Sequence, residues 1–384
     1  MLTLIFNALV WAPQKEIFRI PGIDHPIVWY GLLFASGFII GQQIMFRIYR
    51  KEGLPSRDIE RMTVYMVVAT VIGARLGHCL LYDPVGYLSD PISILKVWEG
   101  GLASHGGALG ILVALWLYVR SSKTKGQSWL FVLDRIVIVV ALGGAFIRMG
   151  NFVNNEMLGI ETKSSAGVVF LTKEEDTMER SSQSIETVDA YKGIGDDYFA
   201  GRVPVELEIT FTKGLSEADV NTMLQKLEAQ LKNPEGPYAT NLFMPGESPM
   251  DYTLDQTNNV YTAYVQAYGI VRHPAQLYEA IYCILLCVFL YWLWAKKRKK
   301  LREGVMLGIF MVVLFTLRIL DEYLKLNQED WEEGLALNAG QMYSIPLILM
   351  GIVILIYAYR KPTPKYSEWK PVEPLEPKKK KEKK

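Results

Sequence analysis

The stretch FIRMGNFVNNEMLG, residues 146–159, gathers side chains that could bind a phosphate. It directly follows the apolar run LFVLDRIVIVVALGGA, and its first eleven residues contain one arginine, three asparagines and one glutamate. A guanidinium group binds phosphate bidentately, and amide side chains can add hydrogen bonds to a headgroup or a peptide. A solvated loop would explain the polar residues, but it would not explain why Gly150, Phe152 and Gly159 lie among them.

Other candidates for chemistry stand in or beside apolar segments elsewhere in the chain. His105 lies within GGLASHGGALG, and RHPAQLYEA contains Arg272 and Gln276. Charged residues inside membrane segments are costly and rare, so each one is a hypothesis for a functional site. Three further candidates are Tyr30, Arg75 and Arg318.

Each candidate also has a purely structural explanation. An arginine near a helix end can extend its side chain to lipid phosphate, and Tyr30 can belong to an aromatic belt at the membrane interface. Taken alone, His105 is better explained as a hydrogen-bonded interior histidine. The glycines around it suit close helix packing as well as the approach of a bulky ligand.

Seven apolar segments must position these residues. Half of the 384 residues are apolar, and a helix needs about 20 nearly uncharged residues to cross a bilayer. The chain is therefore predicted to be an all-α polytopic membrane protein with about seven transmembrane helices. The segments are Ile27 to Phe46, Met62 to Leu81, Leu102 to Val119, Leu130 to Met149, Leu277 to Ala295, Val305 to Leu320 and Met342 to Tyr359.

Lysine and arginine alternate between rich and poor connections, which predicts the orientation. Residues 47–61 carry five, residues 120–127 three, residues 296–302 six and the tail from residue 360 ten, whereas the intervening short connections carry one or two. Basic connections stay in the cytoplasm. The N-terminus and residues 150–274 are therefore predicted to lie outside, and the C-terminus in the cytoplasm.

With this orientation the charged candidates gather at one depth. At ~1.5 Å per helical residue, they fall in the outer leaflet or just beyond it, whereas Asp134 and Arg135 lie near the inner face. Separate structural roles explain such a coincidence poorly. The pattern predicts a polar cavity open to the outer leaflet, in which the simplest ligand is a phospholipid headgroup.

One soluble insert of domain size divides the chain. Residues 1–149 are predicted to form transmembrane helices 1–4, and residues 150–274 a small α+β extracytoplasmic head. Residues 275–360 are predicted to form transmembrane helices 5–7. Residues 361–384, rich in proline and lysine, are predicted to be a disordered basic tail that tethers to the membrane surface and is not a nucleic-acid site.

The head is predicted from its local patterns. GVVFL, VPVELEITF and NVYTAYVQAYGIV alternate or carry β-branched and aromatic residues, as strands do. SEADVNTMLQKLEAQL begins with Ser216, has Asp219 three residues later and shows one apolar stripe, which predicts a capped amphipathic helix. The polar stretch TKEEDTMERSSQSIETVD, residues 172–189, is predicted to be a mobile loop.

The composition argues against several other kinds of site. Cys79, Cys283 and Cys287 lie inside apolar segments, so they are interpreted as small buried hydrophobic residues and not as a disulfide framework. The four histidines and three cysteines show no metal-ligand spacing. No metal and no other cofactor is expected.

Three motifs in one order resemble those of a known family. FIRMGNFVNNEMLG resembles the signature GRxGNFxNxExxG of the bacterial prolipoprotein diacylglyceryl transferases, GGLASHGGALG their HGG segment, and RHPAQLYEA their RHPSQLYE segment. The resemblance covers residues 29–359 and implies seven spans in the bacterial cytoplasmic (inner) membrane. The chain departs from the pattern at Ile147 and Asn155, where the family usually has glycine, and at His78, where tyrosine is common.

The resemblance also implies a reaction. The diacylglyceryl group of phosphatidylglycerol would pass to the thiol of the lipobox cysteine of a prolipoprotein at the bilayer, and glycerol phosphate would leave. Arg148 and Arg272 would stabilise the leaving phosphate, and His105 would be the base, with an orienting role as the rival interpretation. The residues that would hold lipid, headgroup or peptide are Tyr30, Arg75, Asn151, Asn154, Glu156, Gly159, Gln276 and Arg318.

Three other classes of protein fit the residues less well. A transporter of anions would carry its arginines through the membrane depth, often in repeated halves, and neither feature is evident. An intramembrane metalloprotease would need a set of histidine and carboxylate ligands. A lipid-binding scaffold without catalysis would not need His105 beside the arginines.

Overall fold

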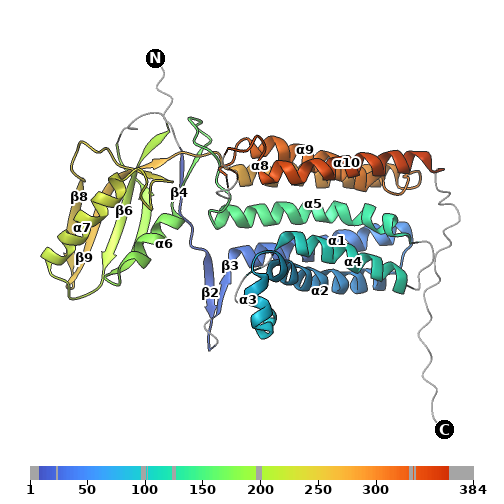
Figure 1. The fold of residues 1–384 in the computed structure, drawn as a ribbon, viewed down its shortest axis with the longest axis horizontal. Helices are drawn as coiled ribbons and strands as arrows, with labels where there is room; N and C mark the ends of the chain where they lie inside the picture. Colours follow the sequence, from blue (N-terminus) through green and yellow to red (C-terminus); the bar gives the residue numbers. More distant parts are fainter. Residues whose placement is uncertain are drawn as a thin grey trace, which may run out of the picture. The chain divides into compact units, whose positions relative to one another are not determined.

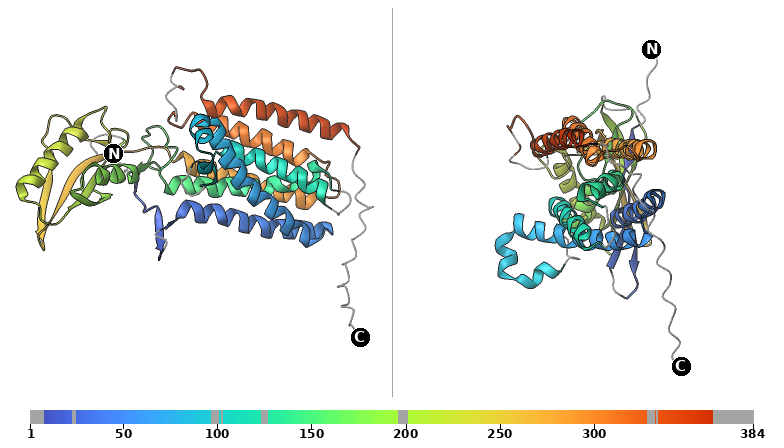
Figure 2. Two further views of the ribbon diagram at one scale, coloured as in Figure 1. Left: turned by 60° about the horizontal axis from the view of Figure 1, so that its bottom comes forward. Right: turned by 90° about the vertical axis from the view of Figure 1, so that its right-hand side faces the viewer.

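The computed structural model describes residues 8–22, 25–96, 101, 103–122, 127–195, 201–327, 332 and 334–362. The chain divides into two compact units, whose elements are drawn in Figures 1 and 2. The first unit comprises residues 1–34, 145–282 and 317–343, and the second comprises residues 35–144, 283–316 and 344–384. The predicted basic tail from residue 363 onward lies outside the described residues.

Each predicted apolar segment coincides over most of its length with one helix. Leu102, at the start of the third segment, lies outside the described residues. The helices are α1 (Trp29–Glu52), α2 (Ser56–Leu81), α4 (Ser104–Ser121), α5 (Trp129–Val153), α8 (Ala275–Lys297), α9 (Val305–Glu322) and α10 (Ala339–Arg360).

Five of these helices, namely α1, α2, α5, α8 and α10, are long and apolar enough to cross a membrane by length and composition. Helix α4 has only 18 residues and includes Arg120, and α9 carries Arg318, Asp321 and Glu322 near its end. In the residues that the structure describes, this membrane protein is therefore rich in helices and also contains a sheet region.

Helices α2 and α4 of the second unit lie side by side (Figures 1 and 2). They pack closely because glycines face each other. A Cβ added at Gly106 would lie 2.7 Å from the Cα of Gly77, and a Cβ added at Gly73 would lie 3.1 Å from the Cα of Gly110. Larger side chains would force the two backbones apart. Helix packing therefore accounts for two of the glycines around His105.

Buried polar contacts join helix ends in the second unit. Arg135 of α5 donates from Nε and Nη2 to the carboxylate of Glu52, at 3.2 and 2.9 Å, and Trp294 Nε1 of α8 donates to the same carboxylate at 2.7 Å. Glu52 ends α1 and Trp294 lies near the end of α8. The basic residues 47–61 and 296–302 therefore lie at the same end of this unit.

Asp134 caps the start of α9 in the same unit. Its carboxylate accepts hydrogen bonds from the backbone N–H groups of Gly304 and Leu307, each at 2.8 Å. The first amides of a helix have no partner within the helix, and a carboxylate there also meets the positive end of the helix dipole. Asp134 and Arg135 thus have structural roles in this unit.

A five-stranded antiparallel sheet lies in the first unit, with strand order β5-β6-β9-β7 and with β8 also paired to β9. Helix α7 (Glu217–Lys232) lies beside β6 and β9 (Figure 1). Its Leu224, Leu227 and Leu231 belong to the same buried core as residues of these two strands. The strands predicted from VPVELEITF and NVYTAYVQAYGIV are confirmed as β6 and β9. The strands are β5 (Ile185–Lys192), β6 (Arg202–Phe211), β7 (Leu242–Phe243), β8 (Tyr252–Thr257) and β9 (Val260–Ile270).

The third predicted strand and the capped helix are also confirmed. GVVFL contains β4 (Val168–Phe170), which pairs in parallel with β1 (Leu9–Trp11), while β2 (Glu16–Ile20) and β3 (His25–Val28) form an antiparallel pair. At the start of α7, Ser216 Oγ accepts from the backbone N–H of Asp219 at 3.3 Å. The Asp219 carboxylate accepts from the backbone N–H of Ser216 at 3.1 Å.

The prediction that residues 172–189 form a mobile loop is wrong. These residues form α6 (Thr172–Ser181) and most of β5. Their carboxylates explain the difference, because Glu175 and Glu179 accept hydrogen bonds from backbone N–H groups of β5 at 2.7 and 3.0 Å. Met178 is buried in the core beneath the helix. The polar residues thus join a helix to a strand, which a composition argument does not reveal.

Candidate active site

Arg148 lies in the last turns of α5, within the first unit, and contacts three side chains. Nε forms an ion pair with Glu279 of α8, and Nη1 donates to Asn151 Oδ1 at 3.2 Å and contacts the sulfur of Met157. The Arg148 side chain is 13% exposed. The guanidinium is therefore held in one orientation, and the side chain as a whole is not fully buried.

The turn after α5 orients the other polar residues of the stretch 146–159. The Glu156 carboxylate accepts from Asn151 Nδ2 at 2.7 Å and from Asn154 Nδ2 at 3.2 Å. Asn155 and Met157 adopt the left-handed backbone conformation, with φ of 55° and 59°. Asparagine tolerates this conformation, but an unbranched apolar side chain adopts it rarely. Backbone strain of this kind gathers at functional sites.

A buried lysine binds three carboxylates beside this turn. Lys325 Nζ forms ion pairs with Glu279, with Asp321 at 3.0 Å and with Glu322 at 3.1 Å. The Lys325 side chain is 1% exposed, and none of the three carboxylate side chains exceeds 5%. Glu279 also pairs with Arg148, so one carboxylate links two cations.

Sequence reasoning did not select Lys325. The only signal was its spacing of three and four residues after Glu322 and Asp321, which is ordinary at the end of a helix. Because Lys325 is buried, its ammonium group must pair with these carboxylates, since a buried ion is stable only when it is paired. We call Arg148, Glu279, Lys325, Asp321, Glu322 and Arg318 the charge network.

Arg318 completes the charge network at Glu322, and Asn338 also donates to the Glu322 carboxylate. Arg318 Nε lies 3.7 Å from one Glu322 oxygen, and Asn338 Nδ2 donates to the other at 3.1 Å. The Arg318 side chain is 32% exposed. Three cations face three carboxylates in the charge network, so their formal charges cancel. A phosphate that enters must therefore share a cation with a carboxylate.

Arg272 is buried, and all three of its guanidinium nitrogens donate to protein groups. Nε donates to Asn241 Oδ1 at 2.8 Å, Nη1 to the Gly159 carbonyl at 3.1 Å, and Nη2 to the Thr240 carbonyl. Burial lowers the pKa of the Arg272 guanidinium below its usual value, although Glu161 and other acids oppose the effect. Arg272 thus fixes Gly159, the last residue of the stretch 146–159.

Gln276 and Tyr30 contact the same stretch. Gln276 Nε2 donates to the carbonyl of Glu156, and the buried Oε1 atom has no hydrogen-bond partner among the described residues. The Tyr30 ring packs onto Gly150, where an added Cβ would lie 2.6 Å from the ring. The structure therefore brings together Tyr30, Arg148, Asn151, Asn154, Glu156, Gly159, Arg272, Gln276 and Arg318 within the first unit.

His105 and Arg75 belong to the second unit. His105 is exposed in the first turn of α4. Arg75 is buried and donates from Nε to the Ile94 carbonyl at 3.0 Å and from Nη2 to the Ser93 carbonyl at 2.6 Å. These carbonyls belong to the short helix η1 (Pro91–Leu95), which follows α3 (Pro84–Ser89). In this structure Arg75 ties that segment to α2.

The cysteines match their interpretation as small buried hydrophobic residues. Cys79, Cys283 and Cys287 are buried free thiols, and the nearest side-chain atom to a Cβ built on Gly144 is the Cys283 sulfur at 3.3 Å. In the described ranges, no group of three or more histidine, cysteine, aspartate or glutamate side chains could hold a metal ion.

Comparison with known proteins decides the family. The model of the family described as prolipoprotein diacylglyceryl transferase matches residues 15–357. The chain belongs to this family. A phosphatidylglycerol–prolipoprotein diacylglyceryl transferase of Tolumonas auensis is 33% identical over 87% of this chain and 92% of its own length. Transferases of the same name from Porphyromonas gingivalis and Chloroherpeton thalassium are 33% and 30% identical, and each alignment covers 92% of this chain and at least 95% of the relative.

Two departures from the pattern of the prolipoprotein diacylglyceryl transferases have physical explanations. Asn155 replaces a usual glycine at a left-handed position, and asparagine is one of the few other residues that tolerate it. His78 replaces a common tyrosine, and its ring stacks on Tyr82 with 5.4 Å between ring centroids. An aromatic ring is thus retained. Nothing in the structure explains Ile147.

A buried carboxyl near Arg272 predicts a pH dependence for this family member. Glu174 accepts from Asn241 Nδ2 at 2.9 Å, and burial raises the pKa of its carboxyl from 4.5 to about 7. The folded state therefore keeps this proton up to about pH 7, whereas the unfolded chain loses it near 4.5. Stability from this group is present below pH 4.5 and falls by about 3 kcal/mol as pH rises through 7.

Glu174→Gln is expected to remove that loss. Between pH 5 and pH 8, amide hydrogen exchange in β6 and β9 should speed up less in the variant than in the wild type, after correction for the intrinsic exchange rate. Glu247→Gln, at an exposed position, is the matched control. Equal pH dependence in all three proteins would contradict the assignment to Glu174.

Proposed function

We propose that this chain transfers the diacylglyceryl group of phosphatidylglycerol to the thiol of the lipobox cysteine of a prolipoprotein. The thiolate sulfur attacks the glycerol carbon that carries the phosphate ester. A carbon–sulfur bond forms, the carbon–oxygen bond breaks, and glycerol phosphate leaves with the bonding electrons. The thiol proton passes to a base. The protein brings no thiol of its own to this reaction, because the substrate supplies the sulfur.

The observation that carries the proposal is the position of Arg148. Its guanidinium is oriented by Glu279 and Asn151, and its side chain retains some exposure, 13%. A fixed cation aimed at the place where negative charge develops stabilises the transition state without reorganising. A planar guanidinium also matches the geometry of a phosphate. We assign to Arg148 the stabilisation of the leaving phosphate.

We assign Arg272 a different role from Arg148. Since its donors already reach Asn241, Thr240 and the Gly159 carbonyl, it acts by positioning the end of the stretch 146–159. Gln276 Oε1 has no hydrogen-bond partner among the residues that the structure describes, so it can accept from a headgroup hydroxyl or a peptide N–H. Asn151, Asn154 and Glu156 form the polar wall on which headgroup or peptide would rest.

Lys325 supports Arg148 through Glu279. Both cations use the Glu279 carboxylate, so each fixes the other in place. If Lys325 were replaced by an apolar residue, the three buried carboxylates around it would lose their central counter-ion, and breaking a buried pair costs about 3–5 kcal/mol. The lysine thus keeps a strongly charged region folded around Arg148.

We assign His105 to the thiol proton, and Arg318 and Tyr30 to the lipid. Arg75 donates to the Ile94 and Ser93 carbonyls, so it would act by positioning that segment against α2. A thiol becomes a nucleophile as thiolate, and an exposed imidazole at the start of α4 can accept its proton. Orientation of the substrate by His105 is the rival role. A pH profile separates these two roles.

We further propose seven transmembrane helices, with α4 and α9 added to the five apolar helices. The N-terminus and an α+β head formed by residues 150–274 would lie outside, and the C-terminus in the cytoplasm, at the bacterial inner membrane. The shared end of the basic residues 47–61 and 296–302 supports this orientation, because both connections would then face the cytoplasm.

A reporter fused after Lys300 is expected to be cytoplasmic, and one inserted near Ser182 is expected to be external, because basic connections are retained in the cytoplasm. Protease added to spheroplasts, in which the outer membrane is opened and the inner membrane is intact, would measure the accessibility of both positions. Cleavage at both sites, or at Lys300 alone, would contradict the orientation.

The reaction itself is tested with the purified full-length protein in detergent. Phosphatidylglycerol labelled in the diacylglyceryl part and a lipobox peptide should yield a labelled thioether peptide and free glycerol phosphate in equal amounts. A peptide with serine in place of the lipobox cysteine is the control. If the protein binds lipid and peptide but forms neither product, it is a binding protein and the proposed reaction is wrong.

A further inference from the structure

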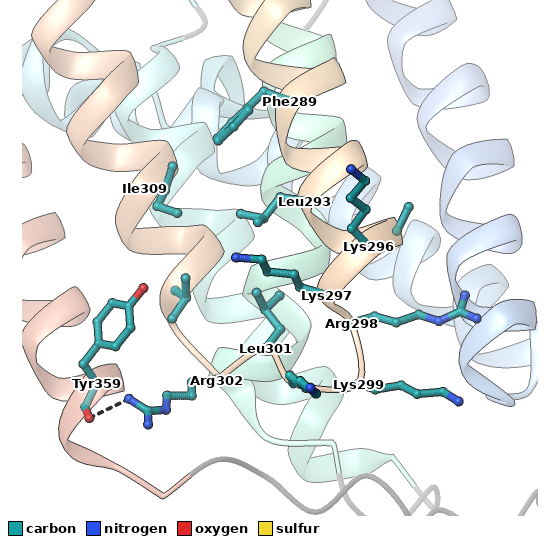
Figure 3. A pocket seen from close by; sticks show the side chains of 13 residues that line it. Phe289, Leu293, Lys296, Lys297, Arg298, Lys299, Leu301, Arg302, Ile309 and Tyr359 are labelled. Carbon is teal, nitrogen blue, oxygen red and sulfur yellow. Dashed lines mark hydrogen bonds between the residues drawn. The ribbon is translucent and has the colours of Figure 1, made fainter.

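A cavity of about 980 Å³ opens where α8 ends and α9 begins in the second unit (Figure 3). Its polar lining consists of the basic residues of segment 296–302, and its apolar lining includes Phe289, Leu293, Val305 and Ile309. Tyr359 of α10 closes one side. We call it the basic cavity.

The basic cavity has a strongly positive lining. Six of its thirteen lining residues are lysine or arginine, and none is acidic. Arg302 Nη1 donates to the Tyr359 carbonyl at 2.8 Å, which anchors one cation between α9 and α10. Figure 3 shows Lys297 extending into the space between α8 and α9, while Arg298 and Lys299 point away from it. The nearby Glu303 is not one of the lining residues, and its carboxylate accepts a hydrogen bond from Ser128 Oγ.

The apolar part of the lining continues along the helices. Phe289 lies eight residues, about 12 Å of helix, before Lys297, and its side chain is 43% exposed. Helix α8 is long and apolar enough to cross a membrane, and in that case an exposed Phe289 would face acyl chains. The basic cavity therefore has lysine and arginine side chains at the end of α8 and apolar side chains earlier along the same helix.

We propose that the basic cavity binds an anionic phospholipid that is not the substrate molecule undergoing transfer. The lipid phosphate would contact Lys296, Lys297 and Lys300, and one acyl chain would lie along Phe289, Leu293 and Ile309. A phospholipid has both a phosphate for the basic residues and an acyl chain for the apolar residues of the lining. A free anion would contact only the basic residues. The volume accommodates a headgroup and the upper part of a chain.

This lipid site is separate from the charge network. Lys297 follows Glu279 by 18 residues, about 27 Å of continuous α8 helix. A phosphate bound at Lys297 therefore cannot contact the residue that pairs with Arg148. Loss of this site should leave the chemical step intact.

The test uses full-length protein in vesicles of phosphatidylcholine with a few per cent of a photoreactive lipid. The reactive group sits on the acyl chain of phosphatidic acid or, in a matched sample, of phosphatidylcholine. Illumination should link phosphatidic acid to the peptides that contain Phe289, Leu293 or Ile309. Phosphatidylcholine should give about tenfold less product, since each nearby cation favours an anionic headgroup several-fold.

The triple variant Lys296→Gln, Lys297→Gln, Lys300→Gln is expected to lower the phosphatidic acid product at these peptides about tenfold or more. Arg298, Lys299 and Arg302 remain, which preserves the basic connection that orients the protein. The matched control, Arg50→Gln, Lys51→Gln, Arg57→Gln, removes three exposed cations from the end of α1 and the start of α2. It should leave these products unchanged.

Three outcomes would overturn the proposal. Equal labelling by the two lipids would mean an apolar groove without headgroup recognition. An equal loss in both triple variants would mean general attraction to a basic surface. Displacement of phosphatidic acid by millimolar inorganic phosphate would mean a site for free anions. Comparable thermal unfolding of all three proteins shows that a lost product reflects binding and not misfolding.

Discussion

Arg148→Lys is expected to lower kcat for diacylglyceryl transfer by about 100-fold or more, the effect of removing one oriented donor to a developing anion. Lysine keeps the positive charge but loses the planar fork that can hold Glu279 and a phosphate together. Because the charge remains, the buried Glu279 keeps a counter-ion and the fold should survive. The measurement is turnover of labelled phosphatidylglycerol at saturating peptide.

Arg202→Lys is the matched control for Arg148→Lys. The Arg202 side chain is 14% exposed, close to the 13% of Arg148, and it also pairs with a glutamate, Glu161 at 2.8 Å, although Glu161 is itself half exposed. Its replacement should leave kcat near the wild-type value. If Arg148→Lys also turned over normally, the phosphate role would be wrong, and an arginine that merely reaches lipid phosphate would be the better explanation.

Arg272→Lys should behave differently from Arg148→Lys. A lysine cannot reproduce the three hydrogen bonds to Asn241, Thr240 and Gly159. Activity is therefore expected to fall together with the thermal stability of the protein. A variant with full stability and a large loss of kcat would instead place Arg272 at the substrate.

His105→Gln is expected to slow transfer by about 100-fold or more, the usual contribution of a general base, and to remove a limb from the pH profile. A general base must be in its neutral form before it accepts the thiol proton, so a reaction that needs such a base loses rate toward acidic pH. Glutamine retains hydrogen bonding but does not titrate. The acidic limb should therefore be absent from the variant.

The pH profiles of both proteins decide between the two roles of His105. They must be measured with one lipid and one peptide. If the thiol ionised unaided, both proteins would show the same limb rising toward pH ~8.5. A variant that retains the wild-type acidic limb and loses little rate would leave His105 as an orienting residue, with the base elsewhere.

The sequence by itself determined the main elements. Uncharged runs of membrane-spanning length coincide with helices, because a helix satisfies its own backbone hydrogen bonds and needs only apolar side chains outside. Alternation likewise identified β6 and β9, and the pair Ser216 and Asp219 identified the start of α7. All of these signals lie within a few residues of one another, so they can be read without the rest of the chain.

The motifs also named much of the candidate site. Arg148, Asn151, Glu156 and Gln276 come together in the structure through the turn after α5 and the start of α8. Their type and spacing marked them, because charged residues inside or directly beside membrane segments are costly and suggest a site.

Only the tertiary structure decided which partners the charged residues take. Lys325 is an ordinary loop lysine in the sequence, and it becomes a buried centre because Glu279, 46 residues earlier, lies against it. The polar residues 172–189 form α6 and β5 because their carboxylates meet backbone N–H groups of a neighbouring element. Such pairings depend on which distant segments pack together, and the energy of a buried charge depends on its partner, so local patterns cannot reveal them.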